Sequence, residues 1–310
     1  MSSQHPVRGV FCAALTPVDA DLRPDFAPFV AHCRHLVADG CTGVALLGTT
    51  GEANSFSTGE RKALLEAALA GGLTPSQLLP GTGVTALTET VELTRHALSL
   101  GVDTVVMLPP FYYKDVSEDG LFATYAETIE RVGDARLRVL LYHIPQFSAL
   151  PIPFGLIERL RARYPDTVVG IKDSAGKLEN MLAMVERFPG FSVLSGADPL
   201  MLPLLRQGGA GAITATTNLV ARELAVVYRH HADPARAAQV EAAQARVVAM
   251  RTLVSIHPQM PSLKTIVAAR TGRADWKRLR PPLTPLTEEQ SRDLLARYDA
   301  LMSGPGGLPA

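Results

Sequence analysis

A lysine that ends an apolar run is the first residue in this sequence whose position suggests chemistry. Lys172 follows Val168-Val169-Gly170-Ile171 and precedes Asp173-Ser174. An ammonium beside a buried strand is costly, and lysine is rarely fully buried without a partner or a task. Burial lowers the pKa of a lysine and frees its amine to attack a carbonyl carbon, which is the usual preparation for Schiff-base catalysis. A lysine whose side chain simply reaches solvent is the alternative that this segment leaves open.

A second candidate is the loop Gly48-Thr49-Thr50-Gly51-Glu52, directly after the apolar run Val44-Ala45-Leu46-Leu47. Two glycines that flank two hydroxyls allow backbone amides and threonine side chains to converge on an anion, such as the carboxylate of a 2-oxo acid. The loop is too short for a nucleotide P-loop and lacks its lysine. An ordinary structural turn is the alternative.

The third candidate is Tyr142, which ends the apolar run Leu140-Leu141 and precedes His143-Ile144-Pro145. A phenol one strand away from a Schiff-base lysine is well placed to transfer protons. A half-buried tyrosine that makes one hydrogen bond is the alternative, and this segment alone favours it.

These three residue sets follow short apolar runs that alternate with longer amphipathic stretches, which is the pattern of repeated βα units. The sequence predicts a (β/α)8 TIM barrel, in which chemistry lies at the carboxyl ends of the strands. The predicted strands are 9–15, 43–47, 78–81, 104–108, 138–142, 168–172, 192–195 and 211–214. Predicted helices between them include 26–38, 57–70, 86–100, 178–188 and 221–231.

After the eighth unit the strand signal ends. The segments 234–253, 262–271 and 287–302 have helical patterns and predict a small C-terminal helical appendage. We therefore expect a catalytic barrel over residues 1–232, a helical subdomain over 233–303 and a flexible tail over 304–310, where Gly304-Pro305-Gly306-Gly307 favours neither helix nor strand.

Composition favours a small-molecule partner. Lys+Arg and Asp+Glu number 30 each, so no net basic charge draws the chain to nucleic acid or to anionic lipid. No uninterrupted apolar stretch approaches the ~18 residues of a membrane span, and we expect a cytoplasmic protein without membrane contact. The three cysteines, Cys12, Cys33 and Cys41, form no C-x-x-C motif and are expected to be buried free thiols.

A glycine-rich segment and two histidine pairs resemble binding motifs but do not predict a phosphate or metal site. Gly208-Gly209-Ala210-Gly211 precedes its strand and so lies at the wrong end of the barrel for a phosphate cradle. The pairs His32/His35 and His230/His231 have no third ligand at a suitable spacing, so we expect solvated helix faces and no metal site.

Taken together, the motifs resemble the pyruvate-dependent class I aldolases typified by dihydrodipicolinate synthase and N-acetylneuraminate lyase. The resemblance runs in order from about Val10 to Leu301. The matching segments are Leu15-Thr16-Pro17, Gly48 to Glu52, Gly81-Thr82-Gly83, Pro109 to Tyr113, Tyr142 with Pro145, Gly170 to Asp173 and Leu194-Ser195-Gly196.

The resemblance implies the roles of the catalytic residues. Lys172 would form the imine and Tyr142 would be the general acid and base. Thr49 and Thr50 would bind the carboxylate, and Thr50 would also take part in the proton relay. The implied substrates are pyruvate or a related 2-oxo acid and an aldehyde, and no cofactor or metal is implied.

The resemblance also implies a homotetramer, a dimer of dimers, in which a tyrosine of the neighbouring subunit completes the relay. Tyr112 matches that tyrosine best, and Tyr113 is the alternative. The remaining implied substrate contacts are Gly196, Asp198, Ile213 and Phe147.

The chain departs from both namesakes where they bind their second substrate. Dihydrodipicolinate synthases place an arginine two residues after the proline that matches Pro145, whereas this chain has Gln146 and then Phe147, so the bidentate carboxylate anchor is missing. Sialate lyases usually carry an acidic residue and a serine toward the polyol, where this chain has Pro199 and Ala215.

Two further departures from the family concern a regulatory site and the residue that follows Tyr142. Thr58 and Arg61 stand where some synthases carry the histidines of a lysine-feedback site, so we expect no inhibition by lysine. His143 stands where most members of the family have asparagine, and the sequence assigns it no role.

The sequence therefore predicts a lyase or aldolase for a 4-hydroxy-2-oxo acid whose distal end is less charged than aspartate semialdehyde. A divergent 4-hydroxy-tetrahydrodipicolinate synthase and a 2-keto-3-deoxy sugar acid aldolase or dehydratase are alternatives within the family. A metal-dependent aldolase on the same barrel would need converging His, Asp or Glu ligands, which the sequence does not suggest. A catalytically idle ligand-binding member would be expected to lack Lys172 or Tyr142.

Overall fold

The computed structural model describes residues 6–303 and contains one parallel sheet surrounded by helices. Within this range the sheet has seven strands in the order β2-β1-β7-β6-β5-β4-β3, and every strand pairing is parallel. The strands are β1 (Gly9–Ala13), β2 (Gly43–Ala45), β3 (Thr104–Met107), β4 (Arg138–His143), β5 (Val168–Asp173), β6 (Ser192–Ser195) and β7 (Gly211–Thr214).

The predicted third strand, 78–81, forms the eighth stave and closes the barrel between β2 and β3. Leu78 bridges Val44 and Gly81 bridges Val106, both in parallel. Pro80 has no N–H to donate, so the ladder is interrupted there, although its carbonyl accepts the Val106 N–H at 2.9 Å. The predicted TIM barrel is confirmed, with one stave reduced to two bridges because of this proline.

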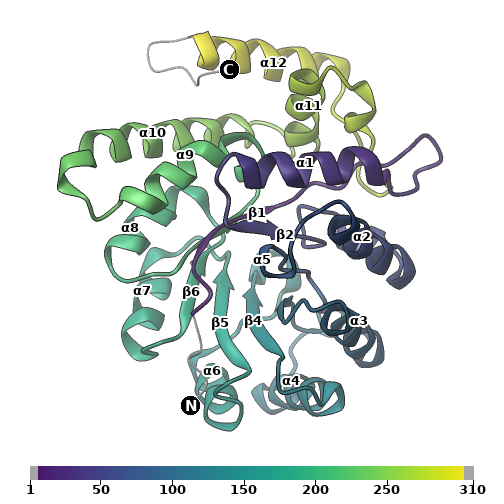
Figure 1. The fold of residues 1–310 in the computed structure, drawn as a ribbon, viewed down its shortest axis with the longest axis vertical. Coiled ribbons are helices and arrows are strands. Elements are labelled where there is room, and N and C mark those ends of the chain that lie inside the picture. The colour runs from purple at the N-terminus through teal and green to yellow at the C-terminus, as the bar shows by residue number, and fades with distance from the viewer. Residues whose placement is uncertain (1–5, 304–310) are drawn as a thin grey trace.

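Helices follow the staves in alternation, as the βα rhythm predicts (Figure 1). The principal ones are α1 (Phe26–Ala38), α2 (Thr58–Ala70), α3 (Leu87–Ser99), α4 (Glu118–Val132), α6 (Phe154–Arg163), α7 (Leu178–Arg187), α8 (Met201–Arg206) and α9 (Thr217–His230). The short elements are η1 (Ala53–Ser55), η2 (Pro75–Gln77), α5 (Pro145–Ser148), η3 (Asp198–Leu200), η4 (Pro234–Arg236) and η5 (Ala274–Lys277). Local sequence explains the start of α2, where Ser57 and Glu60 form a reciprocal capping box.

Each strand contributes to two cores because successive side chains point to opposite faces of a sheet. Phe11, Leu140 and Ile213 pack inside the barrel. Their chain neighbours Cys12 and Leu141 belong to the larger outer core, between the sheet and the helices. Strands buried on both faces explain the nearly continuous apolar runs in the sequence.

The three thiols lie in the outer core. Cys12, Cys33 and Cys41 are free and buried, as predicted. Burial raises the pKa of all three thiols, that of Cys41 to about 12, so none is prepared to act as a nucleophile.

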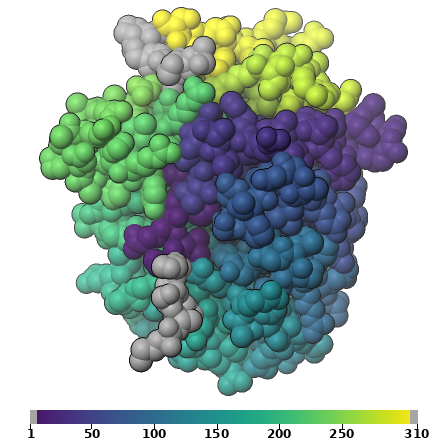
Figure 2. Space-filling model, viewed as in Figure 1, coloured from purple at the N-terminus to yellow at the C-terminus, as the bar shows by residue number. Residues whose placement is uncertain are grey.

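Three helices complete the described chain at one end of the molecule, beside α1 and α9 (Figures 1 and 2). They are α10 (Ala237–Leu253), α11 (Gln259–Thr271) and α12 (Glu288–Ser303), and α10 packs along α9. Helix α11 begins three residues before the predicted Ser262, because Pro261 lies in the first turn, where a missing N–H costs no helical hydrogen bond. The domain boundary at 232/233 stays a prediction, and the predicted tail over 304–310 lies outside the described residues.

Candidate active site

The pairing of β4 with β5 brings two of the predicted catalytic side chains together. Val139 pairs with Val168, but Leu140 pairs with Gly170, so β5 carries one extra residue at a bulge. Beyond the bulge, Tyr142 pairs with Lys172. Both side chains are buried at the end of the barrel interior.

Gly170 allows this register because β5 has no room for a side chain there. A Cβ atom at position 170 would lie 2.5 Å from the Ser192 carbonyl oxygen and 2.7 Å from Leu140 Cδ2. The Lys172 ammonium lies 4.1 Å from the centroid of the Tyr142 ring, within the range of a cation–π contact. The ring face thus contacts the side-chain nitrogen of a residue that is only 6% exposed.

The loop after β2 supplies the third group. Thr49 Oγ1 and the Tyr142 hydroxyl lie 3.2 Å apart and share a hydrogen bond. Thr50 is buried but does not line the same cavity. The structure therefore joins Thr49, Tyr142 and Lys172 in one chain of contacts. The hydroxyl that contacts Tyr142 is that of Thr49, whereas the sequence placed Thr50 in the proton relay, and the role of Thr50 stays a prediction.

A cavity of about 480 Å³, counted with its open mouth, lies over these three side chains. Most of its wall is apolar or backbone, with a few polar side chains that can bind and protonate a small ligand. The lining includes Ala13, Ala45, Leu47, Gly48, Thr49, Asn54, Gly81, Gly83, Leu108, Tyr142, Lys172 and Ile213. Ile213, which the sequence predicted as a substrate contact, is part of this lining, and its contact with substrate stays a prediction.

Other predicted substrate contacts lie outside this lining. Asp198 is fully buried, accepts a 2.8 Å hydrogen bond from Thr216 Oγ1, and has its pKa raised by desolvation. Gly196 donates its N–H to the Asp173 carbonyl at 2.7 Å, and a Cβ there would overlap Ser174. As substrate contacts, Asp198 and Gly196 stay predictions.

Three aromatic side chains near the site loops are exposed in the single chain. Tyr112 and Tyr113 are 72% and 73% exposed and form an edge-to-face pair with ring centroids 5.3 Å apart. Phe147 lies in α5 and is 63% exposed. None of the three lines the cavity around Lys172.

His143 holds the segment that follows β4. Its Nδ1 accepts the backbone N–H of Ile152 at 3.0 Å, so a neutral ring carries its proton on Nε2. Burial lowers the pKa of His143, which favours this neutral form. Nearby, the Gln146 amide donates to the Ser174 carbonyl at 2.7 Å and links α5 to the loop after β5.

Sequence reasoning missed two residues that hold the site in place. Asn218, in α9, donates to the Ala13 carbonyl at 2.8 Å and accepts the Leu15 N–H at 3.2 Å, which holds the end of β1. Lys264, in α11, forms a buried ion pair with Glu52 of the Thr49 loop. The signal for Lys264 was a cation in an apolar helix face that ought to require a partner.

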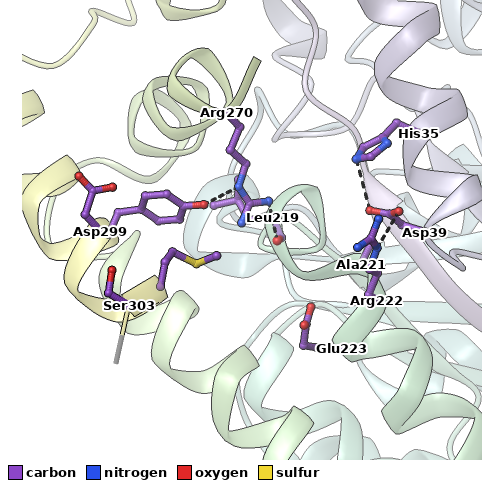
Figure 3. Close-up of a pocket in the computed structure, with 11 residues that line it drawn as sticks. His35, Asp39, Leu219, Ala221, Arg222, Glu223, Arg270, Asp299 and Ser303 are labelled. Atoms are coloured by element: carbon purple, nitrogen blue, oxygen red, sulfur yellow. Dashed lines mark hydrogen bonds and ion pairs between the residues drawn. The ribbon is translucent and has the colours of Figure 1, made fainter. Parts of the chain in front are cut away.

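A second cavity, of about 1120 Å³ on the same measure, lies between α1, α9, α11 and α12 and shares no lining residue with the first (Figure 3). Its polar groups largely pair with one another: Arg270 donates to the Tyr298 hydroxyl and the Leu219 carbonyl, and Asp39 pairs with His35 and Arg222.

Within residues 6–303, no group of three His, Cys, Asp or Glu side chains is placed to hold a metal ion. None of the helices in this range combines the length and apolar composition of a membrane crossing.

A parallel barrel with a buried lysine beside a tyrosine at its strand ends defines a class of enzymes rather than one reaction. The model of the dihydrodipicolinate synthetase family matches residues 6–300, and the chain belongs to this family. Members of the family are lyases and aldolases, so the chain is an enzyme of this class.

Two relatives and one solved structure illustrate the similarity. A DapA-like lyase of Chloroflexus aurantiacus is 38% identical over 305 residues, which cover 96% of this chain and 98% of the relative. The 4-hydroxy-tetrahydrodipicolinate synthase of Bacillus subtilis is 29% identical over 295 residues, or 94% of this chain and 98% of the relative. The structure of YagE, a prophage protein of the dihydrodipicolinic acid synthase family from E. coli in complex with pyruvate, has a TM-score of 0.86 and 26% identity, and covers 94% of this chain and 97% of YagE.

Proposed function

We propose that this chain forms a Schiff base between Lys172 and pyruvate and makes or cleaves a 4-hydroxy-2-oxo acid. The proposal rests on one observation, the chain of contacts from the Lys172 ammonium to the Tyr142 ring and from the Tyr142 hydroxyl to Thr49. A buried amine, a phenol and a hydroxyl in one cavity are the groups that imine chemistry needs. The pyruvate in the YagE complex supports the choice of 2-oxo acid.

In the proposed reaction, the Lys172 amine adds to C2 of pyruvate, and loss of one water leaves a protonated imine. Loss of a proton from C3 gives the enamine, because the imine nitrogen accepts the electron pair. C3 then bonds to the carbonyl carbon of the aldehyde, whose oxygen gains a proton, and one water hydrolyses the imine to release the product and Lys172. Cleavage is the reverse, and the Tyr142 phenol passes the protons in both directions.

A divergent 4-hydroxy-tetrahydrodipicolinate synthase is the second candidate, and the name of the Bacillus subtilis relative favours it. That reaction requires a group to bind the carboxylate of aspartate semialdehyde. The position two residues after Pro145 is Phe147, which offers no hydrogen-bond donor from its ring. We therefore favour an aldehyde partner with a neutral distal end.

The Schiff base predicts that pyruvate and borohydride together leave a reduced adduct on Lys172, because hydride reduces the imine. The measurement is peptide mass spectrometry after proteolysis, with borohydride alone and with the Lys172→Met variant as controls. Unmodified Lys172 at saturating pyruvate, or activity abolished by EDTA, would contradict the mechanism and favour a metal-dependent aldolase.

The proton relay predicts that Tyr142→Phe slows enamine formation by roughly 100-fold or more, since a positioned acid/base group contributes ~10²–10⁴. Exchange of the pyruvate methyl protons in D2O, followed by NMR, measures this step without the aldehyde. Thr50→Val is expected to change the rate in the same direction. Tyr125→Phe is the matched control, because Tyr125 is buried outside the cavity and donates to the Met107 carbonyl. A Tyr142→Phe protein that exchanges at the wild-type rate would remove Tyr142 from the relay.

We further propose that Tyr112 of a neighbouring subunit completes the relay through the Thr49-Thr50 pair, of which Thr49 contacts the Tyr142 hydroxyl, in a cytoplasmic homotetramer. Two large aromatic side chains exposed side by side support an interface at this place. Tyr112→Phe is expected to slow methyl-proton exchange, whereas Tyr113→Phe is expected to leave the rate unchanged. Sedimentation at assay concentration tests the assembly, and a fully active monomer would contradict it.

If the aldehyde partner has a neutral distal end, condensation of pyruvate with aspartate semialdehyde is expected to be slow. Phe147→Arg is expected to raise kcat/KM for aspartate semialdehyde. A carboxylate desolvated against a phenyl ring costs on the order of a few kcal/mol, which corresponds to about a hundredfold in discrimination. The measurement is kcat/KM for aspartate semialdehyde in the wild type, in Phe147→Arg and in Phe147→Leu, which removes the ring without adding a donor. Efficient synthesis by the wild type would show that another residue binds the carboxylate.

A further inference from the structure

A buried ion pair joins the Thr49 loop to the C-terminal helices. The side chains of Glu52, at the end of the loop, and Lys264, in α11, are both completely enclosed and pair with each other. Lys264 Nζ also donates to the Arg278 carbonyl at 2.9 Å. In the described part of the chain, the Glu52 carboxylate has no hydrogen-bond partner besides this ammonium. Because an uncompensated buried carboxylate is strongly unfavourable, the position of Glu52 depends on Lys264.

The backbone of Glu52 transmits this dependence to the site. Its φ of 58° lies in the left-handed region, which non-glycine residues seldom adopt. Its N–H donates to the Thr49 carbonyl at 3.1 Å and closes the turn that presents the Thr49 side chain. Thr49 Oγ1 in turn lies 3.2 Å from the Tyr142 hydroxyl. Three consecutive contacts thus lead from Lys264 to the phenol beside the reactive lysine.

Stability alone does not explain this pair. Replacing a buried ion pair by apolar side chains of similar size is often neutral or stabilising, whereas removing one partner is costly. A second attachment already holds the same C-terminal segment, since Arg280 pairs with Glu60 and donates to the Leu22 and Ser55 carbonyls at 2.7 and 2.6 Å. The charge on Glu52 and Lys264 is therefore better explained by orientation of the loop than by attachment of the helices.

We propose that Lys264 is a positioning residue of the reaction: through Glu52 it holds the loop that presents Thr49 and Thr50 to the bound 2-oxo acid. The C-terminal helices then contribute to proton transfer although they supply no group to the cavity lining. This inference rests on the proposed Schiff-base function and adds to it a requirement from outside the barrel. It predicts that loss of Lys264 affects proton transfer more than imine formation, because Lys172 itself lies on β5 and not on the loop.

The test compares Lys264→Met with Arg270→Met in two assays. Arg270 is a matched control on the same helix, because it bonds the Tyr298 hydroxyl and the Leu219 carbonyl and not the loop. Lys264→Met is expected to slow exchange of the pyruvate methyl protons by roughly 10- to 100-fold, the size of effect that misplaced groups produce. Borohydride trapping of pyruvate on Lys172 is expected to persist at saturating pyruvate, and Arg270→Met is expected to keep the wild-type exchange rate.

A double variant, Glu52→Gln with Lys264→Met, keeps the test decisive if Lys264→Met alone does not fold, as judged by circular dichroism and urea unfolding. The double variant has no buried charge at positions 52 and 264, so we expect it to fold. We also expect it to exchange the pyruvate methyl protons more slowly than Arg270→Met does. The positioning role is overturned if Lys264→Met exchanges the methyl protons at the wild-type rate. If only the double variant folds, the same result in the double variant overturns it. Either result leaves the proposed function intact. Failure of the wild type to trap pyruvate overturns both.

Discussion

The burial of the Lys172 ammonium at the end of an apolar barrel is the constraint on which the rest of the site depends. A parallel barrel directs alternate side chains of every stave into one interior, and this interior is filled mainly by residues such as Leu140, Leu194 and Ile213. A cation there needs stabilisation that leaves its amine available for reaction. The Tyr142 ring supplies it without a counter-charge, and the bulge before Gly170 is what aligns the two side chains.

The described part of the chain contains two buried lysines, Lys172 and Lys264, and their surroundings differ in a way that suits the separate roles proposed for them. Lys264 has a carboxylate and a carbonyl as partners, and its ammonium is committed to the ion pair with Glu52. Among residues 6–303, no carboxylate lies within ion-pair distance of Lys172, which faces an aromatic ring and an open cavity. The unpaired lysine is thus suited to chemistry, and the paired one to holding the loop that serves it.

Much of the fold and part of the site could be predicted from local patterns. The helix over 26–38 was predicted with its observed bounds, whereas the strands over 138–142 and 168–172 were each predicted one residue shorter than observed. Tyr142 and Lys172 were singled out because a polar residue follows an apolar run at the end of each predicted strand. The reduced stave at Pro80 was predicted as a full strand, since its apolar run does not reveal which N–H groups must donate. Lys264 was missed because no local spacing connects it to Glu52, its partner in another part of the chain.

The sequence by itself determined the alternation of strands and helices, the residue types at the stave ends and the family to which the chain belongs, because periodicity and turn chemistry act over a few residues. Only the tertiary structure decided which of those residues meet. The bulge that pairs Tyr142 with Lys172 depends on the close approach of Gly170 to Ser192, and the ion pair of Glu52 with Lys264 depends on how α11 packs. Register and helix docking follow from the packing of the whole core, so contacts between distant segments cannot be read from either segment alone.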